Sequence, residues 1–264
     1  MKKIVLILFL MFVVIENDLM ARDVQLFGKK IGVDQQGNDI YQVHANGIEI
    51  GYKIIGSGEP LVMLMGIGST MERWPVPLIE SLSRKYQLIL MDNRGMGYST
   101  ANDVPFTFKL FASDVVALLD ALQIKKTHVL GLSMGSVITQ ELLLEFSQRV
   151  NKAIVHATCI DEDRVVEQIE RALPNDPIVQ RQLKTHWKTP LDKLPSITNQ
   201  VMLIVGTADT VVGTESSKII ASAIPGAWLV QFKNGTHHLI GEAPDEFSRI
   251  VIDFLDINET VGIK

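Results

Sequence analysis

Hydrophobic residues along the 264-residue chain occur in short, uninterrupted runs. Such runs are typical of strands that are covered on both faces, as in a parallel sheet. The runs are Leu61–Met65, Leu88–Met91, Val129–Leu132, Ala153–Ala157, Val201–Val205 and Trp228–Phe232. Apolar residues also recur near the helical period, at Phe111, Val115, Leu118, Leu119 and Leu122, and at Ile138, Leu142, Leu143 and Phe146. We therefore predict an α/β fold with a mostly parallel central sheet and helices on both faces.

A hairpin is expected before these runs. Strand-like segments at Ile40–His44 and Ile48–Ile55 flank Asn46-Gly47, a dipeptide that tolerates the positive φ angles of a tight turn. No internal repeat or Gly/Ser-rich linker divides the chain after this hairpin. Residues 22–264 are therefore predicted to form one domain that an antiparallel hairpin opens.

A longer, more charged insertion spans about residues 159–196. It contains patterns for two short helices, roughly Arg164–Leu173 and Ile178–Trp187, which is more than one crossover needs. We expect this insertion to form a small cap. Met65, Ile67, Met96, Met134 and Trp187 suggest an apolar lining for the pocket beneath it.

The N-terminus resembles a targeting segment. Lys2 and Lys3 precede an apolar run, Ile4–Ile15, that is too short to span a bilayer core of about 30 Å comfortably. We predict a signal peptide over residues 1–21, cleaved near Ala21; an uncleaved anchor is the alternative, because Leu19 is atypical at its position. Both interpretations place the protein outside the cytoplasm, secreted or periplasmic, with no other membrane span.

Composition narrows the function classes. The formal net charge of −5 comes with no block of Lys or Arg, which argues against a nucleic-acid partner and favours a small-molecule substrate. Cys159 is the only cysteine, so an intramolecular disulfide and a cysteine metal cluster are excluded. We expect no cofactor and no metal, and the sequence gives no sign of the oligomeric state.

The strongest chemical signal is Gly131-Leu132-Ser133-Met134-Gly135. It follows an apolar strand and precedes a helical pattern, the context in which small neighbours let a strained serine project above a sheet. We predict Ser133 as a nucleophile. A serine needs a base and an orienting carboxylate. Asp209 follows the strand Val201–Val205, and His237 and His238 lie in the loop after the last strand.

From about Ile40 to Leu255 the sequence resembles the α/β-hydrolase superfamily. Asp92–Ser99 is similar to its Asp-x-Arg-Gly-x-Gly-x-Ser loop, and Gly206-x-x-Asp209 is similar to its acid turn. The segment from His237 to Pro244 resembles its His-x-x-x-x-Glu-x-Pro ending, a register that selects His237 as the base and leaves His238 as the alternative. Some members carry the acid one strand earlier, where Asp161 or Asp163 is the alternative.

The resemblance also implies two backbone N–H donors for an oxyanion. These are Met134, directly after the nucleophile, and Ile67, in the loop Met65-Gly66-Ile67-Gly68. Many members have histidine where this chain has Met65, and that side chain often braces the loop. The resemblance therefore implies a loop that lacks this side-chain brace but keeps its backbone donor.

These residues predict a serine hydrolase that cleaves a small carboxylic ester through an acyl-enzyme. The same triad also serves C–C bond hydrolysis, lactone opening, amide or imino-peptide cleavage and perhydrolysis. A non-catalytic ligand-binding homologue is the alternative from another class. Ser133 argues against epoxide hydrolase and haloalkane dehalogenase activities, since the resemblance would then require aspartate at position 133.

Overall fold

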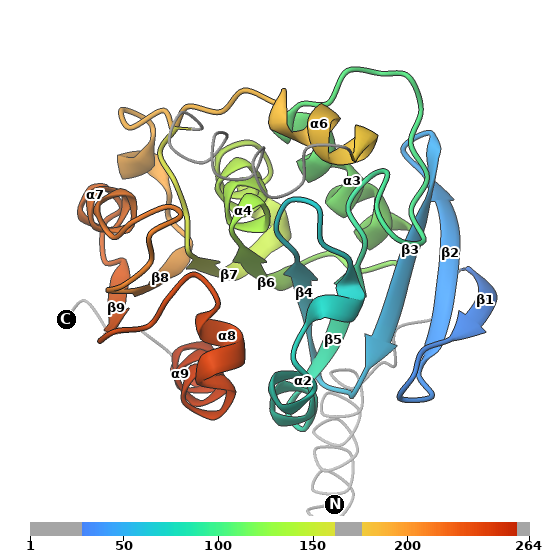
Figure 1. The fold of residues 1–264 in the computed structure, drawn as a ribbon, viewed down its shortest axis with the longest axis horizontal. Coiled ribbons are helices and arrows are strands. Elements are labelled where there is room, and N and C mark those ends of the chain that lie inside the picture. The colour runs from blue at the N-terminus through green and yellow to red at the C-terminus, as the bar shows by residue number, and fades with distance from the viewer. Residues whose placement is uncertain (1–27, 162–175, 258–264) are drawn as a thin grey trace, which may run out of the picture.

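The computed structural model describes residues 28–161 and 176–257. Within them, nine strands form one sheet in the order β1-β2-β3-β5-β4-β6-β7-β8-β9 (Figure 1). The strands are β1 (Lys29–Val33), β2 (Asp39–Ala45), β3 (Ile48–Ile55), β4 (Glu59–Leu64), β5 (Tyr86–Met91), β6 (Thr127–Leu132), β7 (Val150–His156), β8 (Gln200–Gly206) and β9 (Trp228–Phe232). Strands β4 to β9 are parallel, whereas β1, β2 and β3 pair antiparallel. The predicted mostly parallel sheet is confirmed.

Helices cover both faces of this sheet. They are α2 (Val76–Ser83), α3 (Phe108–Ala121), α4 (Met134–Glu145), α6 (Pro177–Leu183), α7 (Glu215–Ala223), α8 (Leu239–Glu242) and α9 (Pro244–Asp256), with the 3₁₀ turns η1 (Met71–Arg73), η2 (Ser147–Arg149) and η3 (Leu194–Ser196). In Figure 1, α3, α4 and α7 lie on one side and α2, α8 and α9 on the other. No helix among the described residues has the length and apolar character that crossing a bilayer requires.

Side-chain alternation along the strands builds two cores. In β4, Val62 and Leu64 join the core beneath α3, α4 and α7, whereas Leu61 and Met63 join the core beneath α2, α8 and α9. All four are fully buried. Because successive strand residues point to opposite faces, a strand covered on both sides must be apolar at every position. This is why the uninterrupted runs predicted the strands well.

The entry hairpin also agrees with its prediction. Asn46 and Gly47 have φ angles of 48° and 74°, and Ala45 pairs with Ile48 across the turn. Strand β1 was not predicted: it lies at the edge of the sheet and its Lys29 and Lys30 are exposed. An edge strand that buries little apolar surface leaves no clear hydrophobic pattern in the sequence.

The cap prediction needs one correction. Helix α6 ends at Leu183, whereas the pattern predicted a helix from Ile178 to Trp187. The segment after α6 turns back toward the end of β7: Lys188 forms a β-bridge with Asp161, and Thr189 N–H donates to the Ile160 carbonyl at 2.7 Å. These backbone bonds end the helix early.

Three predictions fall outside the described residues. They are the signal peptide (1–21), the first cap helix (164–173) and the alternative acid at position 163.

Candidate active site

Ser133 lies at the sharp turn between β6 and α4. Its φ of 54° and ψ of −118° are unusual for a non-glycine residue and cost on the order of 1–3 kcal/mol. A Cβ atom at Gly131 would collide with the Gly135 carbonyl, and one at Gly135 would collide with the Leu64 carbonyl. The two glycines of the motif are therefore required by close backbone packing. The Ser133 N–H donates to the His156 carbonyl at 3.0 Å, which holds the turn against β7.

Asp209 and His237 form a hydrogen-bonded pair. Asp209 Oδ2 lies 2.9 Å from His237 Nδ1, and Asp209 Oδ1 accepts from the N–H groups of Val211 and Val212 at 2.9 and 3.0 Å. Because an ionised carboxylate only accepts, Nδ1 carries the proton and Nε2 is left as the basic nitrogen. This is the tautomer that a general base needs.

The protonation state of Asp209 is set by its surroundings. Burial raises the pKa of this carboxyl, but the bonds from His237, Val212 and Val211 outweigh burial and hold the pKa below its usual value. The side chain is fully buried, whereas that of His237 is 15% exposed. Asp209 is therefore a fixed anion behind a partly accessible imidazole.

The alternative residues are not paired in this way, although His238 lines the same cavity as Ser133. His238 does not reach Asp209; its ring lies 6.0 Å from the His237 ring, edge to face. Asp161 is placed in the bridge to Lys188 and is not paired with His237. The geometry thus brings together Asp209 and His237, the pair that the register of the motif selected.

Ser133 and His237 face the same cavity, whose volume is about 420 Å³. Among the described residues, neither Ser133 Oγ nor His237 Nε2 makes a hydrogen bond. In structures without substrate, catalytic hydrogen bonds are often long and tighten when substrate binds. The cavity lies within the size range of small-molecule sites.

The loop after β4 lies against Ser133. A Cβ atom at Gly66 would stand 3.1 Å from Ser133 Cβ, and Ser69 N–H donates to the Gly66 carbonyl at 3.2 Å, closing a turn. Within the described residues the N–H groups of Ile67 and Met134 have no acceptor, since Met134 opens α4. One unpaired donor thus directly follows Ser133 in the chain, and the other belongs to a residue that lines the same cavity.

Two side chains that the sequence did not single out brace this loop. Asn93 Nδ2 donates to the Met65 carbonyl at 3.0 Å, and Gly68 N–H donates to Gln182 Oε1 at 2.9 Å. Gln182 belongs to α6 and is 2% exposed. Asn93 lies inside the Asp92–Ser99 motif, but no local signal linked Gln182 to a loop so distant in sequence.

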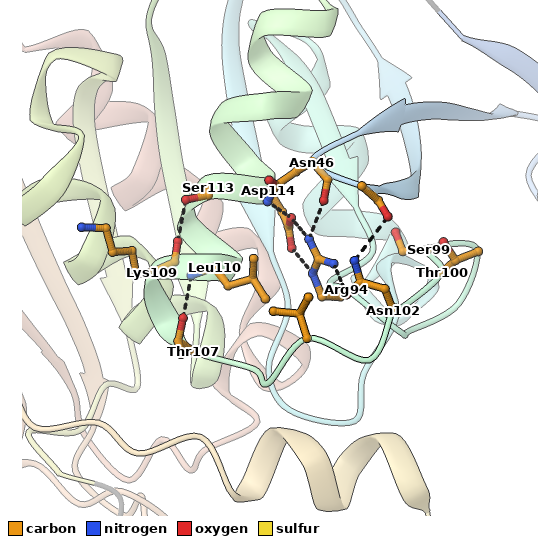
Figure 2. Close-up of polar contacts among 12 residues, drawn as sticks. Asn46, Arg94, Ser99, Thr100, Asn102, Thr107, Lys109, Leu110, Ser113 and Asp114 are labelled. Atoms are coloured by element: carbon orange, nitrogen blue, oxygen red, sulfur yellow. Dashed lines mark hydrogen bonds and ion pairs between the residues drawn. The ribbon is translucent and has the colours of Figure 1, made fainter.

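The Asp92–Ser99 motif holds the surrounding scaffold together. Arg94 is fully buried, and its guanidinium donates to Asp114 on α3 at 2.5 and 2.9 Å and to the Asn46 carbonyl at 3.1 Å. Figure 2 shows the Arg94 guanidinium bonded to both partners, which also bond to each other through Asn46 Nδ2 and Asp114 Oδ1. Asp92 accepts from Met71 N–H at 2.7 Å, which anchors η1. The motif ties the entry hairpin, α3 and η1 together.

The cavity lining corrects one expectation. Of the five apolar residues predicted to line it, Met65 and Ile67 do. Met134 and Trp187 belong instead to the core on the α4 face, where the Trp187 ring packs on Phe108 at 5.4 Å, and Met96 is buried in its own loop. Among the described residues, no group of three or more His, Cys, Asp or Glu is placed to hold a metal ion.

Comparison with known proteins gives consistent matches. A sequence profile of the alpha/beta hydrolase fold matches residues 59–177. A candidate non-heme bromoperoxidase of Mycobacterium tuberculosis is 34% identical over 126 residues, 47% of this chain and 48% of that protein, so the chain spans about half the length of that relative. A candidate carbamate hydrolase of Azorhizobium caulinodans is 25% identical over 256 residues, 80% of this chain and 96% of that protein.

The fold has close counterparts among solved structures. A meta-cleavage product hydrolase of Pseudomonas fluorescens IP01 superposes with a TM-score of 0.73 and 19% identity, covering 81% of this chain and 97% of that one. At this identity the likeness concerns the fold.

Proposed function

Because the chain belongs to the α/β-hydrolase superfamily, we propose that it is a serine hydrolase that cleaves a small carboxylic ester through an acyl-enzyme formed on Ser133. The observation that carries the proposal is that Ser133 and His237 line one cavity, with Asp209 hydrogen-bonded behind His237. The unpaired N–H groups of Ile67 and Met134, residues next to this serine in space or in sequence, support it. A strained serine, an oriented base and unpaired donors are the parts that acyl transfer needs.

Each part has a defined step. Ser133 Oγ attacks the ester carbonyl while His237 Nε2 takes its proton, and buried Asp209 stabilises the imidazolium that results. The N–H groups of Ile67 and Met134 receive the developing oxyanion. His237 then gives the proton to the leaving alcohol, and a water molecule activated by His237 releases the acid and restores Ser133.

The direct test replaces the nucleophile. Ser133→Ala is expected to lower kcat on short 4-nitrophenyl esters on the order of 10⁶-fold, as in comparable serine enzymes, because no acyl-enzyme forms. A fluorophosphonate should label the wild type at Ser133 and should not label the variant. Ser113→Ala, on the surface of α3, is the matched control. Wild-type turnover by Ser133→Ala would overturn the proposal.

The reaction type is tested with a panel. The relatives are named for different reactions, so lactone, C–C, amide and peracid substrates are measured beside the esters. Our proposal expects the highest kcat/KM on an ester, and a higher value on any other class would replace that assignment.

We also propose that the enzyme acts outside the cytoplasm. Lys2, Lys3 and the apolar run Ile4–Ile15 support this. Cell fractionation with N-terminal sequencing of the recovered protein tests it; activity confined to the cytoplasm would contradict it.

A further inference from the structure

The described lining of the Ser133 cavity contains one permanently charged side chain, Arg73. Arg73 ends η1, which follows the oxyanion loop. Most of the other lining side chains are apolar: Met65, Ile67, Pro75, Leu132, Val211 and Ile240. Arg73 is itself an exposed residue, so its charge lies at the solvent-facing part of this mostly apolar lining, where an entering ligand can reach it.

Arg73 has no protein partner among the residues that the structure describes: its guanidinium donates no hydrogen bond and pairs with no carboxylate. The neighbouring Glu72 is already engaged, because Lys53 Nζ lies 3.0 Å from it. This cation is therefore free to meet a ligand.

No acid of the described lining offsets Arg73. Asp209 lies behind His237 rather than in the lining, and both of its oxygens accept hydrogen bonds. A carboxylate entering the cavity would meet an unpaired guanidinium, and the described lining holds no acidic side chain. A planar guanidinium binds a carboxylate through two parallel hydrogen bonds, a geometry that a neutral ester tail does not offer.

We infer that the substrate carries a carboxylate in addition to the ester that is cleaved, and that Arg73 binds this carboxylate. The inference rests on the proposed function, because it concerns the substrate of the same site. It makes Arg73 a specificity-determining residue: its charge selects the substrate, while Ser133 and His237 perform the chemistry.

A matched pair of esters tests the preference. Mono-4-nitrophenyl adipate carries a terminal carboxylate, and 4-nitrophenyl 6-methylheptanoate replaces it with an isopropyl group of the same shape. The ratio of their kcat/KM values, charged over neutral, is expected to fall about 10-fold or more in Arg73→Gln, the loss typical of a charged hydrogen bond. Arg73→Lys keeps the positive charge but cannot form two parallel hydrogen bonds with a carboxylate. It is expected to retain part of the preference for the charged ester.

The control is Arg84→Gln. Arg84 is an exposed residue at the end of α2 that does not line the cavity, and its removal changes the net charge equally. The ratio should stay at its wild-type value in this variant. An equal fall in both variants would assign the effect to overall charge and overturn the inference.

A binding measurement keeps this result separate from turnover. In a Ser133→Ala background, calorimetry compares 4-phenylbutyrate with its uncharged amide, with and without Arg73→Gln. A loss of about 10-fold in either the ester ratio or the acid-to-amide binding ratio supports the inference. If Arg73→Gln changes neither ratio, the inference is wrong while the proposed function stands. If no ester is cleaved and Ser133 is not labelled, the proposed function fails and the binding ratio still decides the role of Arg73.

Discussion

Asp209 and Ser133, two residues of the candidate site, are each fixed in orientation by several contacts. Asp209 uses one oxygen for His237 and the other for two backbone N–H groups, so its carboxylate cannot rotate away from the imidazole. Ser133 keeps a strained backbone because its neighbours Gly131 and Gly135 pack directly on other backbone atoms. In the proposed function, orientation of this kind lets Ser133 act as the nucleophile and His237 as the base.

Replacing the acid tests this orientation. In Asp209→Asn the new amide can donate to His237 Nδ1, which moves the ring proton to Nε2 and removes the base. We expect kcat to fall on the order of 10⁴-fold with the fold intact. Steady-state kinetics and circular dichroism measure this. Asp192→Asn, an exposed change of the same type, is the control; comparable activities in the two variants would contradict the role of Asp209.

At the scale of elements, α6 braces the loop after β4 through the bond from Gly68 N–H to Gln182. Asp176 caps its first turn by accepting from the N–H groups of Ile178 and Val179. Arg181 secures the helix from the side, because its guanidinium lies 4.0 Å from the Phe106 ring and donates to the Asn102 carbonyl at 2.8 Å. A helix fixed in this way presents Gln182 to Gly68 in one position. Many members of the superfamily brace this loop with a histidine where this chain has Met65. Here Gln182, on another element, braces it instead.

Gln182→Met tests this brace, since it keeps the size of the side chain and removes the acceptor for Gly68 N–H. We expect kcat to fall about 10-fold, less than the loss of a whole oxyanion donor, with KM nearly unchanged, because the oxyanion exists only in the reaction. Gln180→Met on the same helix is the control. A rise in KM without a change in kcat would show that Gln182 serves substrate binding instead.

On the scale of the whole molecule, the parallel sheet determines where the site forms. The loops after β4, β6, β8 and β9 supply Ile67, Ser133, Asp209 and His237, and all four strands end at the same edge. Open α/β sheets bind ligands at this edge.

His156 is buried at the end of β7, where its Nδ1 lies 3.1 Å from the Ile204 carbonyl and its ring packs on Phe247. Burial lowers the pKa of His156 to about 4, and the hydrogen bond to the Ile204 carbonyl raises this pKa by a smaller amount.

This buried histidine predicts a loss of stability in acid. At pH values between about 4, the pKa of His156 in the native state, and about 6.5, its usual pKa, His156 is protonated in the unfolded chain but neutral in the native state. Stability therefore falls as the pH drops through this window, by about 3 kcal/mol in total for this group. Urea unfolding at neutral pH and at about pH 4.5 should show a smaller loss in His156→Gln than in the wild type. His44→Gln, in the exposed hairpin, should behave like the wild type; parallel losses in all three would refute the assignment.

The sequence by itself determined the features that depend on neighbours in the chain. The buried strands, the hairpin at Asn46-Gly47 and the turn at Ser133 were predictable, because burial on both faces, positive φ and steric crowding act over a few residues. The family resemblance selected Asp209 and His237, whereas only the tertiary structure decided that Gln182 meets Gly68 and that Arg73 faces the cavity. It also decided that Trp187 belongs to the core rather than the pocket. Such contacts join residues far apart in sequence, and they depend on how the sheet brings its loops to one edge and how the helices pack around it, which no local pattern records.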